Sequence, residues 1–243
     1  MISHTSHPSA TDPSGAQQIQ KMFSAIAPRY DLLNTLLSLG FDRYWRRELI
    51  QALSPQPEER FLDVATGTGD VLRELCRQKP GGIPKPVGID FSVPMLVKAR
   101  NKVASFGCRL AAGAAENLPL DGGTFDGVTV AFGLRNFADL DRGLREIHRV
   151  LKPGGRLGVL EFSLPRSPAL RALYQLYFYQ ALPLIGRWVS GHPDAYRYLP
   201  ESVLKFPVRE GLSERMQKAG FEKTAFEDLT FGIVTLYQAR KRV

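Results

Sequence analysis

The 243-residue chain has only two cysteines, Cys76 and Cys108, and their spacing matches no metal-ligand motif. This excludes a disulfide-rich scaffold and a zinc site built from cysteine pairs. We therefore expect two reduced thiols in a cytoplasmic protein. The sequence offers no other cluster suited to a metal ion, so we expect no metal cofactor.

Long apolar runs are missing as well, so no segment predicts a membrane-spanning helix. The polar N-terminus lacks the apolar region of a signal peptide. We expect residues 1–16 to form a disordered tail, because the Ser, Pro, Gly and His side chains there have little to bury.

Positive charge is abundant, with a net charge of +8 and a pI near 9.6. The basic residues are scattered, and the sequence has no basic stripe interleaved with aromatics of the RNA-binding kind. We therefore expect no nucleic-acid partner, and we interpret the charge as a weak attraction to anionic lipid.

From Phe61 onward, short apolar runs alternate with amphipathic segments, which is the pattern of a parallel α/β sheet. Ser92 with Pro94, and Asp139, predict the starts of two helices. The segment from Phe221 to Lys241 predicts two strands joined near residues 230–232, a closing hairpin. The other expected strands are 60–65, 86–90, 109–113, 125–131 and 156–162.

The segment FLDVATGTGD, residues 61–70, predicts a strand, a turn carrying Gly67 and Gly69, and a helix. Glycine lets a ligand lie against the backbone, and the helix start offers free N–H groups. The third glycine of the dinucleotide fingerprint is replaced by Leu72, and no Gly-Lys-Ser/Thr of a P-loop follows. The loop therefore favours a nucleotide without a pyrophosphate.

Two acidic residues flank this loop: Asp63 precedes it, and Asp90 ends the next apolar run. An acid at the tip of a second parallel strand can accept hydrogen bonds from both hydroxyls of a ribose. A ligand with an adenosine but no phosphate suits this arrangement. Asp63, Gly67, Gly69 and Asp90 therefore predict a site for S-adenosylmethionine.

Four blocks of the sequence together resemble the quinone-ring C-methyltransferases of menaquinone and ubiquinone biosynthesis. One is the glycine loop with Asp90, and the others are MFSAIAPRYDLLNTLLSLGFDRYW (22–45), AENLPLDGGTFDGVTVAFGLRNFAD (115–139), and RVLKPGGRLGVLEFS (149–163) followed by DAYRYLPESV (194–203). The resemblance covers nearly everything after the tail. Leu33, Asp42 and Ala131 depart from the family pattern, and we interpret Asp42 as a helix cap.

The resemblance implies an α/β fold of the class I S-adenosylmethionine-dependent methyltransferases. This fold is Rossmann-like, with a mostly parallel seven-stranded sheet and a closing antiparallel hairpin. Residues 17–243 would form one domain, with N-terminal helices at 17–58 and a helical insertion at 164–210 that covers the substrate. The aromatic insertion has two interpretations. It packs in a homodimer or against the N-terminal helices, or it forms a channel or membrane-facing surface for a polyprenyl tail.

Site residues follow from the same resemblance. Thr68 would touch the methionine end of the cofactor, and Asp90 its ribose. Ala115 and Glu116 would lie along the adenine. The glycine loop itself would hold the cofactor as already expected.

The implied reaction is C-methylation of a polyprenyl quinol, mainly demethylmenaquinol to menaquinol, by an enzyme in the cytoplasm or peripheral to the inner face of the membrane. Arg135 would stabilise the quinolate, with a salt bridge to a carboxylate such as Asp139 as the alternative role. Asn136 would orient a ring oxygen, and Tyr30 and Asp31 would cover the site, Asp31 as a base or a helix cap. Two alternatives stay open: methylation of a ubiquinone-pathway benzoquinol, and a catalytically silent cofactor-binding component of a quinone-synthesis complex.

Overall fold

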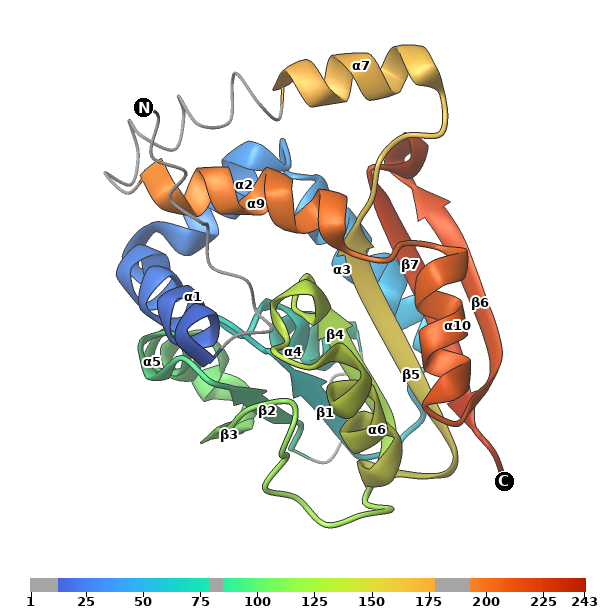
Figure 1. Cartoon of the computed structure of the whole chain (residues 1–243). Helices are drawn as coiled ribbons and strands as arrows, with labels where there is room; N and C mark the ends of the chain where they lie inside the picture. Colours follow the sequence, from blue (N-terminus) through green and yellow to red (C-terminus); the bar gives the residue numbers. More distant parts are fainter. Residues whose placement is uncertain (1–12, 79–84, 178–192) are drawn as a thin grey trace.

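The computed structural model describes residues 13–78, 85–177 and 193–243 (Figure 1). At its centre lies a seven-stranded sheet with the order β3-β2-β1-β4-β5-β7-β6. All neighbouring strands are parallel except β7, which is antiparallel to both β5 and β6. The strands are β1 (Phe61–Val64), β2 (Val87–Asp90), β3 (Arg109–Ala112), β4 (Phe125–Ala131), β5 (Leu151–Phe162), β6 (Phe221–Leu229) and β7 (Val234–Lys241). The predicted parallel sheet with a closing antiparallel hairpin is confirmed.

Strand β5 begins earlier than the predicted strand at 156–162. Phe125 pairs with Leu151 and Gly127 pairs with Arg156, so β5 carries extra residues opposite one short step of β4. Gly154 takes a φ of 75° within this irregularity. Pro153, Gly154 and Gly155 therefore lie in a bulge inside this strand.

Helices cover both faces of the sheet. On one face lie α3 (Phe41–Leu53), α4 (Asp70–Gln78) and α5 (Val93–Val103), and on the other lie α6 (Leu140–Val150) and α10 (Glu210–Lys218) (Figure 1). Residue alternation along β5 separates the two faces. Gly158 faces Leu49 of α3, whereas Leu157 and Val159 belong to the core that contains α6 and α10.

A third group of helices lies beyond the carboxyl ends of the parallel strands (Figure 1). It consists of α1 (Pro13–Ile26), η1 (Ala27–Arg29), α2 (Tyr30–Leu37), α7 (Pro168–Leu176) and α9 (Pro193–Lys205). Helix α1 contacts both α5 and α9. These helices enclose the edge of the sheet where ligands bind in open α/β folds. None of the described helices is long and apolar enough to cross a membrane.

Helix starts can be compared with the predictions. Ser92 and Asp139 occupy the N-caps of α5 and α6 as predicted, and Asp139 accepts a hydrogen bond from the Arg142 N–H at 2.9 Å. The cap interpretation of Asp42 is wrong, because Gly40 is the N-cap of α3 and Asp42 is a buried residue of its first turn. Helix α1 starts at Pro13, inside the expected tail, and residues 1–12 lie outside the described residues.

Candidate active site

The glycine loop after β1 depends on left-handed backbone geometry. Ala65, Gly67 and Gly69 have φ values of 55°, 54° and 82°. A Cβ added to Gly69 would lie 3.2 Å from the Cβ of Ala99, so the loop packs tightly on α5. These are the two conditions that favour glycine: positive φ and close backbone approach.

Asp90, at the tip of β2, lies directly beside this loop. Its Oδ2 accepts a hydrogen bond from the Gly67 N–H, and its Oδ1 accepts one from the Ser92 N–H, both at 2.8 Å. Burial raises the pKa of its carboxyl. Each carboxylate oxygen has a second lone pair, so Asp90 can still accept hydrogen bonds from a ligand.

A cavity of about 340 Å³, here called the loop cavity, opens next to Asp90. Five of the predicted site residues line it, besides Tyr30: Gly67, Asp90, Ala115, Glu116 and Asn136. Segments after four strands meet here, as expected at the carboxyl edge of a parallel sheet. Glu116 also fixes Ala138, another lining residue, because its Oε1 accepts a hydrogen bond from the Ala138 N–H at 2.5 Å.

Asp63 and Thr68 do not line the loop cavity. Asp63 is buried under the loop, where it accepts hydrogen bonds from the hydroxyls of Thr66 at 2.6 Å and Thr129 at 2.7 Å. Burial raises its pKa to about 7, although both hydroxyls act in the opposite direction. Asp63 therefore stabilises the loop through buried hydrogen bonds and does not line the cavity.

The Thr68 hydroxyl takes part in a charged network that joins α2 to the loop. It donates to Asp31 at 2.5 Å and accepts from the Lys102 ammonium at 2.8 Å. Lys102 also lies 2.7 Å from Asp31 and 2.8 Å from Asp70. Asp31 does not line the loop cavity, nor the second cavity described below. Its carboxylate instead links the N-terminal helices to the glycine loop.

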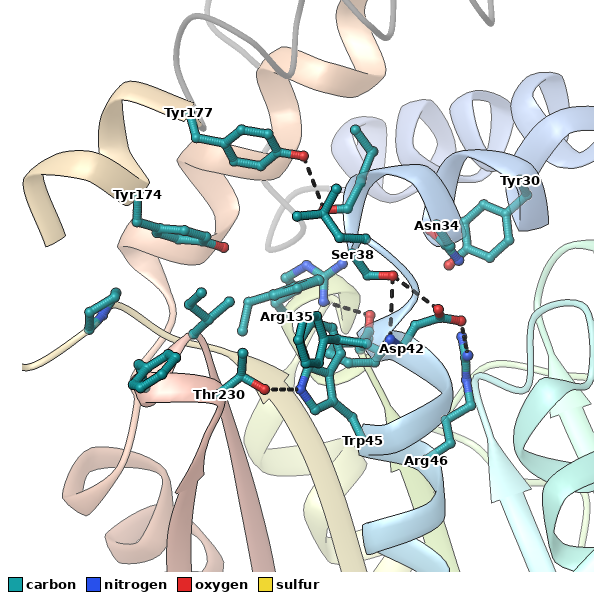
Figure 2. A pocket seen from close by; sticks show the side chains of 18 of the residues that line it. Tyr30, Asn34, Ser38, Asp42, Trp45, Arg46, Arg135, Tyr174, Tyr177 and Thr230 are labelled. Atoms are coloured by element: carbon teal, nitrogen blue, oxygen red, sulfur yellow. Dashed lines mark hydrogen bonds and ion pairs between the residues drawn. The ribbon is translucent and has the colours of Figure 1, made fainter. Parts of the chain in front are cut away.

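The network continues into α3 through Arg46. This guanidinium pairs with Asp42 and lies 3.5 Å from Asp70, and the Ser38 hydroxyl donates to Asp42 at 3.0 Å (Figure 2). Burial opposes ionisation of Asp70, but Arg46 and Lys102 together hold its pKa below the usual value. The loop, α2, α3 and α5 are thus connected by ion pairs.

Figure 2 shows a second cavity of about 370 Å³, here called the aromatic cavity. The rings of Phe132 and Phe162 have centroids 4.6 Å apart, and Trp45 lies 5.9 Å from Phe132. The Trp45 indole N–H donates to Thr230 at 2.7 Å, which fixes the ring. The walls are mostly apolar and aromatic, which suits a planar apolar ligand.

Arg135 is a buried cation that lines the aromatic cavity, as does Arg46. The Arg135 Nη1 lies 2.7 Å from both Glu161 Oε2 and the Phe132 carbonyl oxygen, so the predicted salt bridge exists with Glu161 rather than Asp139. Burial acts to lower the Arg135 pKa, but Glu161, Tyr198 and Tyr30 together outweigh it and the pKa is raised. Within the described residues, its buried Nε has no hydrogen-bond partner.

The two cavities share three lining residues: Phe23, Tyr30 and Phe132. Tyr30 reaches the glycine loop, because its Cε1 lies 4.0 Å from the position of a Cβ on Gly67. Phe132, one of the shared residues, has a φ of 59°, a left-handed backbone conformation that is rare for a bulky side chain. The two cavities are therefore adjacent, with Phe23, Tyr30 and Phe132 as a common wall.

Sequence reasoning missed Glu161, Lys102 and Tyr198. Glu161 lies in the 149–163 block that carried the resemblance but was not singled out there, and Lys102 belongs to none of the blocks. The ion-pair partner of each is distant in sequence. Tyr198 belongs to the 194–203 block that carried the resemblance, and its hydroxyl donates to Asn136 at 3.0 Å.

Comparison with known proteins adds to this geometry. Residues 11–241 match the model of the ubiE/COQ5 methyltransferase family. The chain is 48% identical to a ubiquinone/menaquinone biosynthesis C-methyltransferase of Geobacter sulfurreducens, over 93% of this chain and 89% of the relative. It is 50% identical to a demethylmenaquinone methyltransferase of Deinococcus radiodurans, over 93% of each chain.

Solved structures are similar in fold at low sequence identity. A methyltransferase of Thermotoga maritima, described as a possible histamine N-methyltransferase, has a TM-score of 0.65 and 23% identity, covering 91% of this chain and 99% of its own. The cyclase SpnF has a TM-score of 0.68 and 20% identity, covering 94% and 96%. Because such different activities share this fold, these likenesses identify the fold alone.

Proposed function

The chain belongs to the ubiE/COQ5 methyltransferase family, and from this premise we propose that it transfers the methyl group of S-adenosylmethionine to a ring carbon of a polyprenyl quinol. The main substrate in this proposal is demethylmenaquinol, giving menaquinol. The names of the relatives from Geobacter sulfurreducens and Deinococcus radiodurans support quinone-ring C-methylation. The observation that carries the proposal is that the loop cavity and the aromatic cavity are adjacent and share Phe23, Tyr30 and Phe132.

The loop cavity would hold the cofactor. Asp90 would accept hydrogen bonds from the ribose hydroxyls, and Ala115 and Glu116 would lie along the adenine. A sulfonium methyl is already a strong electrophile, so the protein mainly has to align it with its acceptor. Asp63 and Thr68 would serve by holding the shape of Gly67 and its neighbours.

The aromatic cavity would hold the quinol ring. A quinone is too electron-poor to attack the methyl group, whereas a quinolate carries charge on the ring carbon next to its oxygen. Phe132 and Phe162 offer faces for the ring to stack on. Arg135 is charged at any working pH, and its Nε–H, which has no partner among the described residues, would donate to the quinolate oxygen.

Arg135 is a poor proton acceptor, so it would stabilise charge rather than remove a proton. Tyr30 lines both cavities and would orient the ring against the methyl group. We assign Asp31 a positioning role instead of a base, since its carboxylate is paired with Lys102 outside both cavities.

Exposed apolar side chains ring the mouth of the aromatic cavity. Leu39, Leu173 and Phe231 line the cavity and are 79%, 64% and 81% exposed, each on a different element. Substrates with a polyprenyl tail reside in membranes, so these residues would contact lipid while the ring enters the cavity. The enzyme would then act peripherally, aided by its positive charge.

The test is a methyl-transfer assay with labelled S-adenosylmethionine and chemically reduced demethylmenaquinone in detergent micelles. The unreduced quinone and a ubiquinone-precursor quinol are run in parallel. We expect label on a quinol and none on the quinone, with the preferred ring assigning the pathway. Cofactor binding without label on any quinol would instead support the catalytically silent alternative.

A further inference from the structure

Tyr198 lies between the two cavities on an element that the sequence did not connect with the cofactor. It belongs to α9, is 8% exposed, and lines the aromatic cavity. Its hydroxyl donates to Asn136 Oδ1 at 3.0 Å. Asn136 ends the short helix η3 (Leu134–Asn136) and lines the loop cavity. One hydrogen bond therefore joins a wall of each cavity.

This bond sets the orientation of the Asn136 amide. An amide presents an acceptor oxygen on one side and two N–H donors on the other, and rotation by 180° exchanges them. Within residues 13–78, 85–177 and 193–243, the bond from Tyr198 is the one hydrogen bond recorded for the Asn136 side chain. A donor on the Oδ1 side leaves both N–H groups for the remaining side.

Tyr198 is suited to act as a permanent donor. Burial raises the pKa of its phenol, although Arg135 acts to lower it, so the hydroxyl stays protonated at neutral pH. The negative charge of Glu161 also raises the pKa of the Tyr198 phenol. Because the bulky side chain is buried in a helix that packs on η3, the donor is held in place.

We propose that Tyr198 is a positioning residue that orients the Asn136 amide, so that its N–H donors are turned toward the loop cavity, where the methyl donor would bind. The inference rests on the proposed methyl transfer for its kinetic consequence. Its structural content, an amide fixed by a phenol, stands apart from any substrate.

The kinetic test is a double-mutant cycle of Tyr198→Phe, Asn136→Ala and the double variant. Loss of one hydrogen bond that orients a reacting group predicts a kcat about tenfold lower for Tyr198→Phe. In the Asn136→Ala background the same change should have almost no further effect. If the two effects instead multiply, Tyr198 acts independently of Asn136 and the proposal is overturned. Tyr44→Phe, at a 44% exposed site outside both cavities, is the matched control.

A second measurement needs no turnover. The side-chain amide signals of Asn136 in a ¹⁵N-labelled sample are assigned by their disappearance in Asn136→Ala. We expect Tyr198→Phe to shift these signals and to speed their exchange with water, while Tyr44→Phe leaves them unchanged. Unchanged signals in Tyr198→Phe would disprove the proposal. If the wild type methylates no quinol, this result still decides the positioning role, so the two failures are distinguishable.

Discussion

Asp31 of α2 and Lys102 of α5 form an ion pair with 2.7 Å between carboxylate and ammonium. The Thr68 hydroxyl of the glycine loop lies between them and bonds to both. Three segments distant in sequence therefore meet at one point outside the cavities. A change there should alter how the N-terminal helices close on the loop rather than the chemistry itself.

Asp31→Asn tests this relationship. We expect several-fold weaker binding of S-adenosylhomocysteine by calorimetry, because the helices lose their charged link to the loop. Asp31 is partly exposed, so the stability loss should be only about 1 kcal/mol or less. Asp141→Asn is the matched control, since it breaks a similarly exposed pair with Arg215 on another face. A fall in turnover of about a hundredfold with unchanged affinity would indicate that Asp31 is a base after all.

Asp90→Ala should weaken cofactor binding by about tenfold or more, since a carboxylate that accepts from ribose hydroxyls is removed. The hydrogen bonds from the Gly67 and Ser92 N–H groups are lost too, so the loop itself should loosen. Calorimetry gives the affinity, and circular dichroism checks that the fold is kept. Unchanged affinity in a folded variant would remove the ribose assignment.

Arg135 requires a paired substitution, because Arg135→Ala alone would leave Glu161 buried and unpaired. Breaking such a pair costs about 3–5 kcal/mol. In Arg135→Met with Glu161→Gln, both charges are gone, and stability should stay closer to that of the wild type. We expect turnover to fall about a hundredfold or more while cofactor affinity is kept.

Arg156→Met with Glu59→Gln removes another ion pair between a strand and a loop, away from both cavities, and is the control. It should leave turnover unchanged. If the Arg135 and Glu161 double variant also keeps its turnover, the role of Arg135 in stabilising the quinolate is wrong.

Asp63 predicts a pH dependence of stability. Burial raises its pKa to about 7 in the folded protein, whereas an unfolded Asp has a pKa of about 3.9. The folded state therefore binds the proton more tightly, and the stability contributed by this group is fully present below about pH 4 and lost as pH rises to about 7. Asp63→Asn should flatten this fall, measured by urea unfolding of the cofactor-free protein from pH 4 to 8. An identical pH profile in wild type and variant would contradict the raised pKa.

Predictions from the sequence succeeded where the signal is local. Positive φ at Gly67 and Gly69, the caps Ser92 and Asp139, and the alternation of apolar runs each depend on a few neighbouring residues. The sequence did not predict the bulge in β5 or the role of Asp42. The bulge depends on the pairing of β5 with β4, and the role of Asp42 depends on the burial of its network, which Arg46 extends to Asp70. Asp42 is held by Arg46 and Ser38 in a buried network, so an acid near a helix start was not a cap.

By itself, the sequence determined the order of the elements, the closing hairpin and the glycine loop after β1, since these follow from periodicity and turn chemistry along the chain. Only the tertiary structure decided which side chains meet. It brought Glu161 to Arg135, Lys102 to Asp31 and Tyr198 to Asn136. The physical reason is that buried charges and amides are stable only with partners, and those partners come from whichever strand or helix the packing places beside them.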